Sequence, residues 1–208
     1  MLSWNEDCII YKIENHSSNF DFNELPSSSF EQVTFSDINN ELIEINYAWI
    51  DPVRIRDKII SKEQKEVTFW LFKNEKILCS FANSESTMSY AINKLGKILS
   101  FGYTRINPFD HWVKNYFKKN NWFAELISVH IKTTPSAFDN NEIKKISIKS
   151  LSEFNYKSLF DKHTVTNLTF SMNNTIFYID SVSVISFPNT IKESDILKIL
   201  SVVIKEFI

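Results

Sequence analysis

The amino-acid sequence predicts an α+β fold, in which antiparallel sheets carry helices packed on one face. Short segments that alternate polar and apolar residues, as half-buried strands do, recur along the 208-residue chain. Segments with apolar residues at helical spacing follow groups of these strands. The chain has only two glycines, Gly96 and Gly102, which are too few for the glycine motifs of Rossmann enzymes, P-loop NTPases or α/β-hydrolases.

The first elements are expected to be two strands and a short helix. Residues 8–13 form an apolar strand, and residues 41–47 alternate polar and apolar side chains. The polar residues 16–29 between them are typical of a loop. Asp51 followed by Pro52 has the form of a helix start, with a capping carboxylate before a proline, and predicts a helix that runs to about residue 62.

A β-hairpin and a long helix are predicted next. Residues 67–72 and 76–81 form the two strands of the hairpin, around a turn at residues 73–75. Ser86 or Thr87 is the expected N-cap of the helix that follows. The apolar residues of this helix recur at helical spacing: Met88, Ala91, Ile92, Leu95, Ile98 and Leu99.

A helix and a strand are predicted in the aromatic-rich stretch 107–131. Asn107 as N-cap, Pro108 at the first helical position and Asp110 in the first turn favour a helix start. The apolar stripe of this helix consists of Trp112, Val113, Tyr116 and Phe117. The strand, residues 122–131, places on one face Phe123, Ile127, Val129 and Ile131. We therefore interpret these aromatic residues as core residues.

The alternative for the same stretch is a surface that stacks bases and holds phosphates. It would consist of Trp112 with Lys114, Lys118 and Lys119, assisted by the lysines at 144, 145 and 149. The net charge of −2 gives no overall attraction to nucleic acid. Only three of the 23 basic residues are arginine, which also weighs against a nucleic-acid reader.

The second half of the chain is predicted to repeat the element order of the first. Strands at 168–170 and 175–179 flank a turn at Asn173 and Asn174, and a final helix covers about 192–207. These similarities suggest an internal duplication that gives two related β-α-β-β-α subdomains. The predicted segments are an N-terminal strand and loop (1–35), the first subdomain (36–105), a connecting helix and strand (106–138) and the second subdomain (139–208).

The cysteines and the start of the chain predict a cytoplasmic protein. Cys8 and Cys79 are too few for a disulfide framework and do not form a metal-type pair, so we expect them to be reduced and half-buried. Residues 1–7 are acidic and do not begin with the basic region of a signal peptide. No apolar run approaches the length of a membrane-spanning helix, and we expect no membrane partner.

No motif predicts a cofactor. The four histidines are not at metal-ligand spacing, and His130 is expected on the polar side of its strand. One carboxylate pattern does match what a metal-dependent nuclease of the PD-(D/E)xK type needs: Glu142 and Lys144, with Asp139 and Asp110 upstream. We interpret these residues as solvated charges at a strand edge, and keep the nuclease as an alternative.

The last helix is apolar on most of its surface. Internal burial is the simplest explanation, and an interface with a partner or a second copy is the alternative. The interface would be formed by Ile196, Leu200, Val203 and Phe207. The sequence therefore favours a non-catalytic protein-binding factor, of the inhibitor, immunity, counter-defence or assembly-adaptor type. A nucleic-acid-binding protein and a metal-dependent nuclease are the alternatives.

Overall fold

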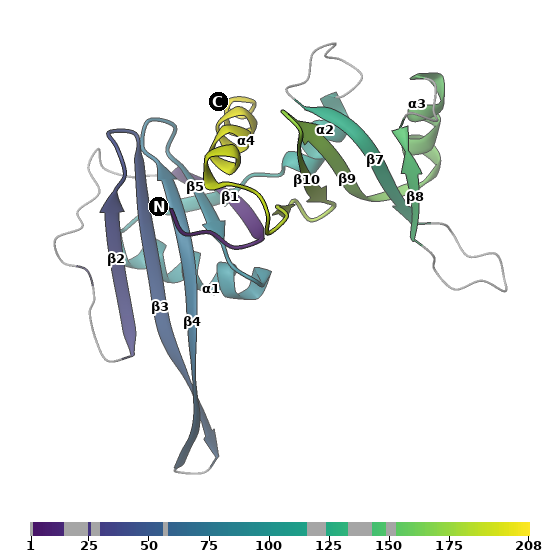
Figure 1. Cartoon of the computed structure of the whole chain (residues 1–208). Helices are drawn as coiled ribbons and strands as arrows, with labels where there is room; N and C mark the ends of the chain where they lie inside the picture. The colour runs from purple at the N-terminus through teal and green to yellow at the C-terminus, as the bar shows by residue number, and fades with distance from the viewer. Residues whose placement is uncertain are drawn as a thin grey trace. The chain divides into compact units, whose positions relative to one another are not determined.

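The computed structural model describes residues 2–14, 25, 30–55, 58–115, 124–132, 143–148 and 153–208. The chain divides into two compact units, one formed by residues 1–106 with 207–208, and the other by residues 107–206. Both units combine antiparallel strands with helices, which confirms the predicted α+β class (Figure 1). The finer division into four segments stays a prediction.

The first unit contains a sheet in which every neighbouring pair of strands is antiparallel. Its strand order is β2-β3-β4-β5-β1, and β6 also pairs with β1. The strands are β1 (Asp7–Glu14), β2 (Glu31–Asp37), β3 (Leu42–Ile55), β4 (Lys58–Phe72), β5 (Ile77–Phe81) and β6 (Gly102–Arg105). The predicted strands at 8–13 and 41–47 and the hairpin at 67–81 are confirmed.

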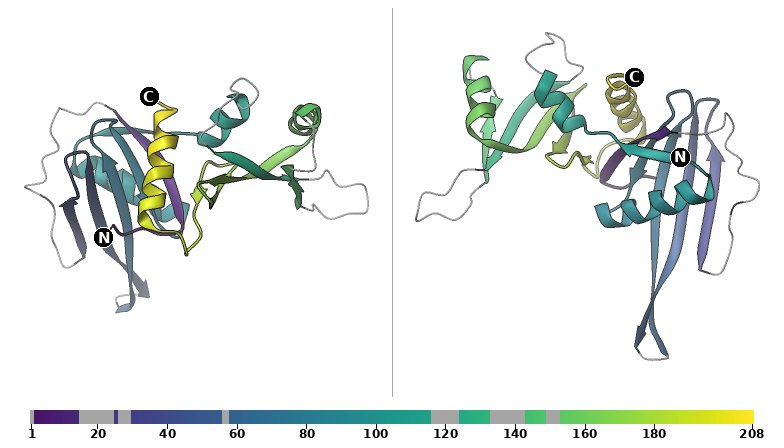
Figure 2. Two further views of the ribbon diagram at one scale, coloured as in Figure 1. Left: turned by 45° about the horizontal axis from the view of Figure 1, so that its top comes forward. Right: turned by 180° about the vertical axis from the view of Figure 1, so that it is seen from behind.

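Helix α1 (Glu85–Ile98) lies across one face of this sheet and contacts β4 and β5 (Figure 2). Its buried stripe contains four of the predicted residues, Met88, Ala91, Ile92 and Leu95. The N-cap is Ser84, whose Oγ accepts a hydrogen bond from the Thr87 N–H at 3.2 Å. The predicted caps, Ser86 and Thr87, were therefore two or three positions late in a segment where several hydroxyl residues compete for the role.

The predicted helix over residues 51–62 is wrong, because this segment is the distal part of the β3–β4 hairpin. The two strands stay paired as far as Ile55 opposite Lys58, with a bulge at Val53 and Arg54. Figure 1 shows them continuing past the end of β2. Among the described residues, the register of β2 with β3 ends at Trp49, so the later part of β3 pairs with β4 alone. An edge position of this kind tolerates the missing N–H of Pro52.

Cooperative strand pairing overrides the local capping signal here. A helix of about ten residues is marginal without tertiary contacts, whereas extending β3 and β4 adds hydrogen bonds to a ladder that already exists. The lost helix was one of the elements shared by the two proposed subdomains. The internal duplication itself stays a prediction.

Both cysteines lie in the first unit and are free. Cys8 on β1 and Cys79 on β5 are fully buried, which is deeper than the half-buried state expected from the sequence. Burial, followed by the hydrogen bond to Cys79, raises the pKa of the Cys8 thiol. Because the protonated thiol is the inert form, the pair behaves as small core hydrophobes.

A buried carboxylate ties the N-terminal residues to the same sheet. Glu44 is only 6% exposed, and its oxygens accept hydrogen bonds from the Ser3 N–H at 2.9 Å and the Asn46 amide at 3.0 Å. The Trp70 indole N–H donates to the Ser3 carbonyl oxygen at 2.9 Å. These bonds satisfy polar groups that would otherwise be costly to bury.

The second unit contains a sheet with the antiparallel order β11-β10-β9-β7-β8. Its strands are β7 (Glu125–Lys132), β8 (Ile143–Ser147), β9 (Thr164–Met172), β10 (Thr175–Asp180) and β11 (Ile185–Ser186), and its helices are α2 (Pro108–Asn115), α3 (Glu153–Lys162) and α4 (Glu193–Lys205). The predicted turn at Asn173 and Asn174 is confirmed. Both residues have positive φ, 51° and 64°, as the type I′ turn of a two-residue hairpin requires.

We expect Gly96→Ala to destabilise the protein, although alanine usually stabilises a helix interior by about 1 kcal/mol over glycine. A Cβ at this position would lie 3.0 Å from the backbone oxygen of Phe101. The Phe101 N–H in turn donates to the Gly96 oxygen at 2.9 Å, so the close approach is part of the helix end. Urea unfolding should show a loss of about 1 kcal/mol.

The matched control is Lys97→Ala, one residue further along α1 and exposed. It should change the free energy of unfolding by less than about 0.5 kcal/mol. A stabilising effect of Gly96→Ala would contradict the packing described here.

Candidate functional site

The apolar stripe of α4 is buried. Ile196 and Leu200 are 0% exposed and Val203 is 2% exposed, whereas Phe207 beyond the helix is half-buried. These are the four residues that the sequence suggests as an interface. Other residues of α4 stay partly exposed to solvent. They are Leu197, Ser201 and Val202.

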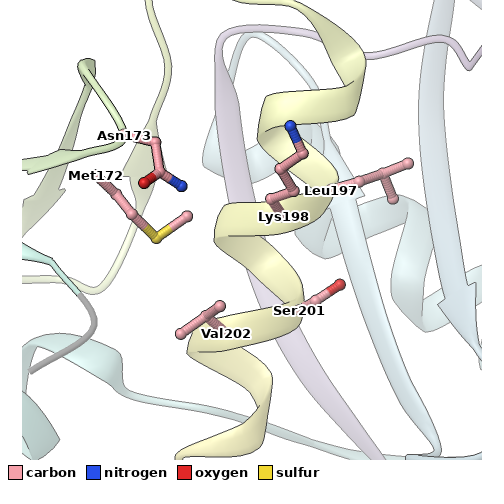
Figure 3. Close-up of a pocket in the computed structure, with 6 residues that line it drawn as sticks. All are labelled: Met172, Asn173, Leu197, Lys198, Ser201 and Val202. Carbon is pink, nitrogen blue, oxygen red and sulfur yellow. The ribbon is translucent and has the colours of Figure 1, made fainter.

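These residues line a hollow of about 530 Å³ in the second unit (Figure 3). The helix contributes Leu197, Lys198, Ser201 and Val202, and the turn between β9 and β10 contributes Met172 and Asn173. Figure 3 shows Met172 and Asn173 projecting toward α4, and Val202 pointing to the same side as Met172. The hollow therefore combines a helix face with the tip of a β-hairpin.

Local sequence explains how both walls form. Residues four apart lie on the same side of a helix, so Leu197 stands with Ser201 and Lys198 with Val202. Figure 3 shows Leu197 and Ser201 on the side of α4 remote from Met172, and Val202 on the near side. On the other wall, the type I′ turn ends the hairpin immediately after Met172, which pairs with Thr175. Lys198 is held at the rim by an ion pair with Asp195 at 3.0 Å.

The chemistry of the hollow suits binding. Met172, Leu197 and Val202 offer apolar surface, while Asn173, Ser201 and Lys198 offer hydrogen-bonding groups. Methionine adapts its shape to different occupants, because its side chain is unbranched and flexible. The six residues include no carboxylate, imidazole or thiol that would supply acid–base or nucleophilic catalysis.

The nuclease residues are only partly described. Glu142 and Asp139 lie outside the described residues, and Lys144 is exposed on β8. Asp110 is in the first turn of α2, where the Asn107 amide donates to its carboxylate at 3.0 Å. Within the described ranges, no group of three or more histidines, cysteines or carboxylates gathers at one place.

The nucleic-acid alternative rests on α2, whose predicted start is confirmed. The Asn107 side chain caps the helix by accepting from the Asp110 N–H at 2.9 Å. Trp112 is 2% exposed, and its ring lies 5.1 Å from that of Phe170 and 6.0 Å from that of Phe160. Trp112 is therefore a core residue. Lys114 is exposed, whereas Lys118 and Lys119 lie outside the described residues.

The strand β7 differs in detail from the predicted strand 122–131. It has a bulge at Ile127, which shifts Leu126 onto the apolar face with Val129. His130 pairs with Asn167 on β9, and Ser128 pairs with Thr169. These residues lie on the other face of the sheet, which is polar, as expected for His130. Among the described residues, the buried side-chain atoms without a hydrogen-bond partner include Ser128 Oγ, His130 Nε2, Asn167 Oδ1 and Thr169 Oγ1.

The comparisons with protein families and with curated proteins found no relative of this chain. No protein-family model matches the chain, and no curated protein is similar to it. In the described part of the chain, no helix combines the length and the apolar character needed to cross a membrane. Function must therefore be inferred from the surfaces themselves.

We expect Trp112→Ala to lower the free energy of unfolding by about 3–5 kcal/mol, because it removes a fully packed aromatic side chain. Lys114→Ala, two positions further along the same helix and exposed, should have little effect. Chemical denaturation of both variants measures the difference. Equal stability of the two variants would show that the Trp112 ring is not part of the core.

We expect the free energy of unfolding to decrease as the pH is lowered from about 7 to about 5, and we expect His130 to contribute to this decrease. Burial, and then the positive charge of Lys145, lower the pKa of His130. An unfolded histidine has a pKa of about 6.5. As the pH falls through this value, the unfolded chain binds a proton that the folded chain resists, so folding becomes less favourable.

Urea unfolding at several pH values would measure this dependence. His130→Gln should remove its share of the loss on acidification. Lys145→Gln should reduce that share, since it removes one cause of the lowered pKa. An unchanged pH profile in His130→Gln would contradict the assignment.

Proposed function

We propose that this protein is a non-catalytic protein-binding factor, of the inhibitor, immunity, counter-defence or assembly-adaptor type, that acts through α4. The observation that carries the proposal is the hollow lined by α4 and the β9–β10 turn. The partner would place an apolar anchor side chain against Met172 and Val202. Its polar atoms would meet Asn173 and Lys198 at the rim.

The proposal is supported by the way in which hot spots of protein interfaces are built. An anchor side chain in a desolvated pocket contributes most of the binding energy, and a polar rim excludes water around it. Burying one leucine-sized side chain stabilises a complex by about 2 kcal/mol. The Lys198 ammonium favours a carboxylate nearby, which adds more to orientation than to affinity because exposed ion pairs are weak.

The proposed compartment is the cytoplasm. Cys8 and Cys79 are both free and buried, as is usual for proteins of a reducing compartment. A second copy of the chain is the other partner that an apolar hollow could accept.

Val202→Arg tests the proposal, because it places a long charged side chain at the wall of the hollow. Tagged wild-type protein and variant are used to capture partners from the source cells, and quantitative mass spectrometry compares them. The captured protein is then purified and titrated. We expect the variant to bind it at least about tenfold more weakly, the equivalent of about 1.4 kcal/mol.

Ser194→Arg is the control, because it adds the same charge to an exposed position two turns earlier on α4 that does not line the hollow. It should bind like the wild type. Binding that Val202→Arg leaves intact would disprove the role of the hollow. A wild-type chain that is monomeric by size-exclusion chromatography and retains no partner would disprove the function.

A further inference from the structure

One face of the sheet in the second unit carries polar side chains on four neighbouring strands. Side chains that stand opposite one another in a sheet share a face, so the register of the strands shows which residues lie together. Two rows form what we call the polar array: Ser128 of β7, Thr169 of β9 and Tyr178 of β10 in one row, and Lys145 of β8, His130 of β7 and Asn167 of β9 in the other. Trp112 of α2 lies against Phe170, which points to the opposite face, so α2 packs on the other side of the sheet.

The array contains buried polar atoms that lack a hydrogen-bond partner. Four of the seven such side-chain atoms in the described part of the chain belong to it: Ser128 Oγ, His130 Nε2, Asn167 Oδ1 and Thr169 Oγ1. Ser128 is only 1% exposed and Thr169 only 4%. Buried polar groups nearly always have a partner, and one left without a partner lowers the stability of the fold. The gathering of four such atoms on two pairs of facing residues points to a ligand.

The array can be reached from solvent. Lys145, at its β8 end, is exposed, and both His130 and Tyr178 are half-buried. The histidine and the tyrosine are longer than Ser128 and Thr169, which they adjoin on the same face. A ligand therefore reaches the two hydroxyl groups when His130 and Tyr178 change rotamer. Rotamer changes of partly exposed side chains are fast and do not require the sheet to open.

The unpartnered atoms define the chemistry of the ligand. The hydroxyl groups of Ser128 and Thr169 can each donate and accept a hydrogen bond, whereas Asn167 Oδ1 can only accept. A ligand that only accepts hydrogen bonds would leave the asparagine oxygen unpaired, whereas ligand hydroxyl groups donate as well as accept. Neighbouring strands lie about 4.8 Å apart, and residues two apart on one strand are separated by roughly 7 Å. These spacings suit one sugar ring, and the Tyr178 ring offers an apolar surface for its C–H groups.

The charges beside the array favour an acidic group on that sugar. Lys145 stands opposite His130, and after burial its positive charge is the second cause of the lowered pKa of this histidine. Asp180 lies at the other end of the same row, on β10, where its Oδ1 accepts hydrogen bonds from the N–H groups of Val182 at 3.0 Å and Val184 at 2.8 Å. Because that carboxylate is directed toward its own turn, the ammonium group of Lys145 sets the charge at the β8 end.

We propose that the polar array binds a sugar ring that carries an acidic group. Hydroxyl groups of the sugar bond to Ser128, Thr169 and Asn167, and the acidic group faces Lys145. The C–H groups of the ring pack against Tyr178. This site uses none of the residues of the α4 hollow, and the two proposals are tested separately.

NMR titration of the isotopically labelled full chain measures binding. The probes are the acidic sugars glucuronate, galacturonate and glucose 6-phosphate, with glucose and galactose as neutral counterparts. We expect at least one acidic sugar to bind at least about tenfold more tightly than its neutral counterpart. The signals of residues 128, 130, 167 and 169 should shift. Lys145→Gln should remove the preference for the acidic sugar, because it removes the positive charge at this end of the array.

Thr169→Val separates a ligand-binding role of the hydroxyl group from a structural one, because valine keeps the shape of threonine. The variant should bind the acidic sugar at least about tenfold more weakly. It should also unfold at a higher urea concentration than the wild type, since an unpartnered buried hydroxyl group destabilises the free chain. Ser128→Ala should show the same two effects. Thr164→Val is the matched control, at an exposed position of β9 outside the array, and should resemble the wild type in both measurements.

Three results would overturn the proposal. One is that none of the acidic sugars binds more tightly than its neutral counterpart. Another is a set of signal shifts that maps outside the array. The third is a loss of stability in both Thr169→Val and Ser128→Ala, since the two hydroxyl groups would then have partners within the folded chain.

Discussion

The pairing of β3 with β4 is the constraint on which the first unit depends. It runs from Leu42 opposite Phe72 to Ile55 opposite Lys58, the longest register in the described chain. Neighbouring residues of β4 point to opposite faces, and Phe69 and Trp70 are both 0% exposed. Unlike many antiparallel sheets, which leave one face in water, this sheet is therefore buried on both faces over these strands.

The sequence predicted elements well where the signal is local and failed where a non-local contact decides. Asn107 caps α2 because its own side chain reaches an N–H three residues later, and Asn173 and Asn174 tolerate positive φ by themselves. Asp51 and Pro52 carry an equally good local signal, but the segment continues an existing ladder and pairs with β4 from Asp51 opposite Glu63 to Ile55 opposite Lys58. Capping patterns are therefore least reliable next to a long strand.

For the same reason, the sequence predicted the helix that contributes to the candidate site but not the residues that face it. The repeat of apolar residues on α4 is visible in the sequence, but the side of the helix that the chain covers depends on tertiary packing. Met172, the residue opposite the accessible side, is 25 positions before Leu197 and joins it only through the fold. The one available signal is its place directly before the Asn173–Asn174 turn, which marks it as the tip of a hairpin.

The composition of the hollow beside α4 limits what it can select. A hollow discriminates by side-chain shape, because binding energy comes from filling apolar space. Met172 weakens that discrimination, because an unbranched, flexible side chain adapts to occupants of different shape. Selectivity between apolar anchors must therefore come from the polar groups of Asn173 and Lys198 beside them.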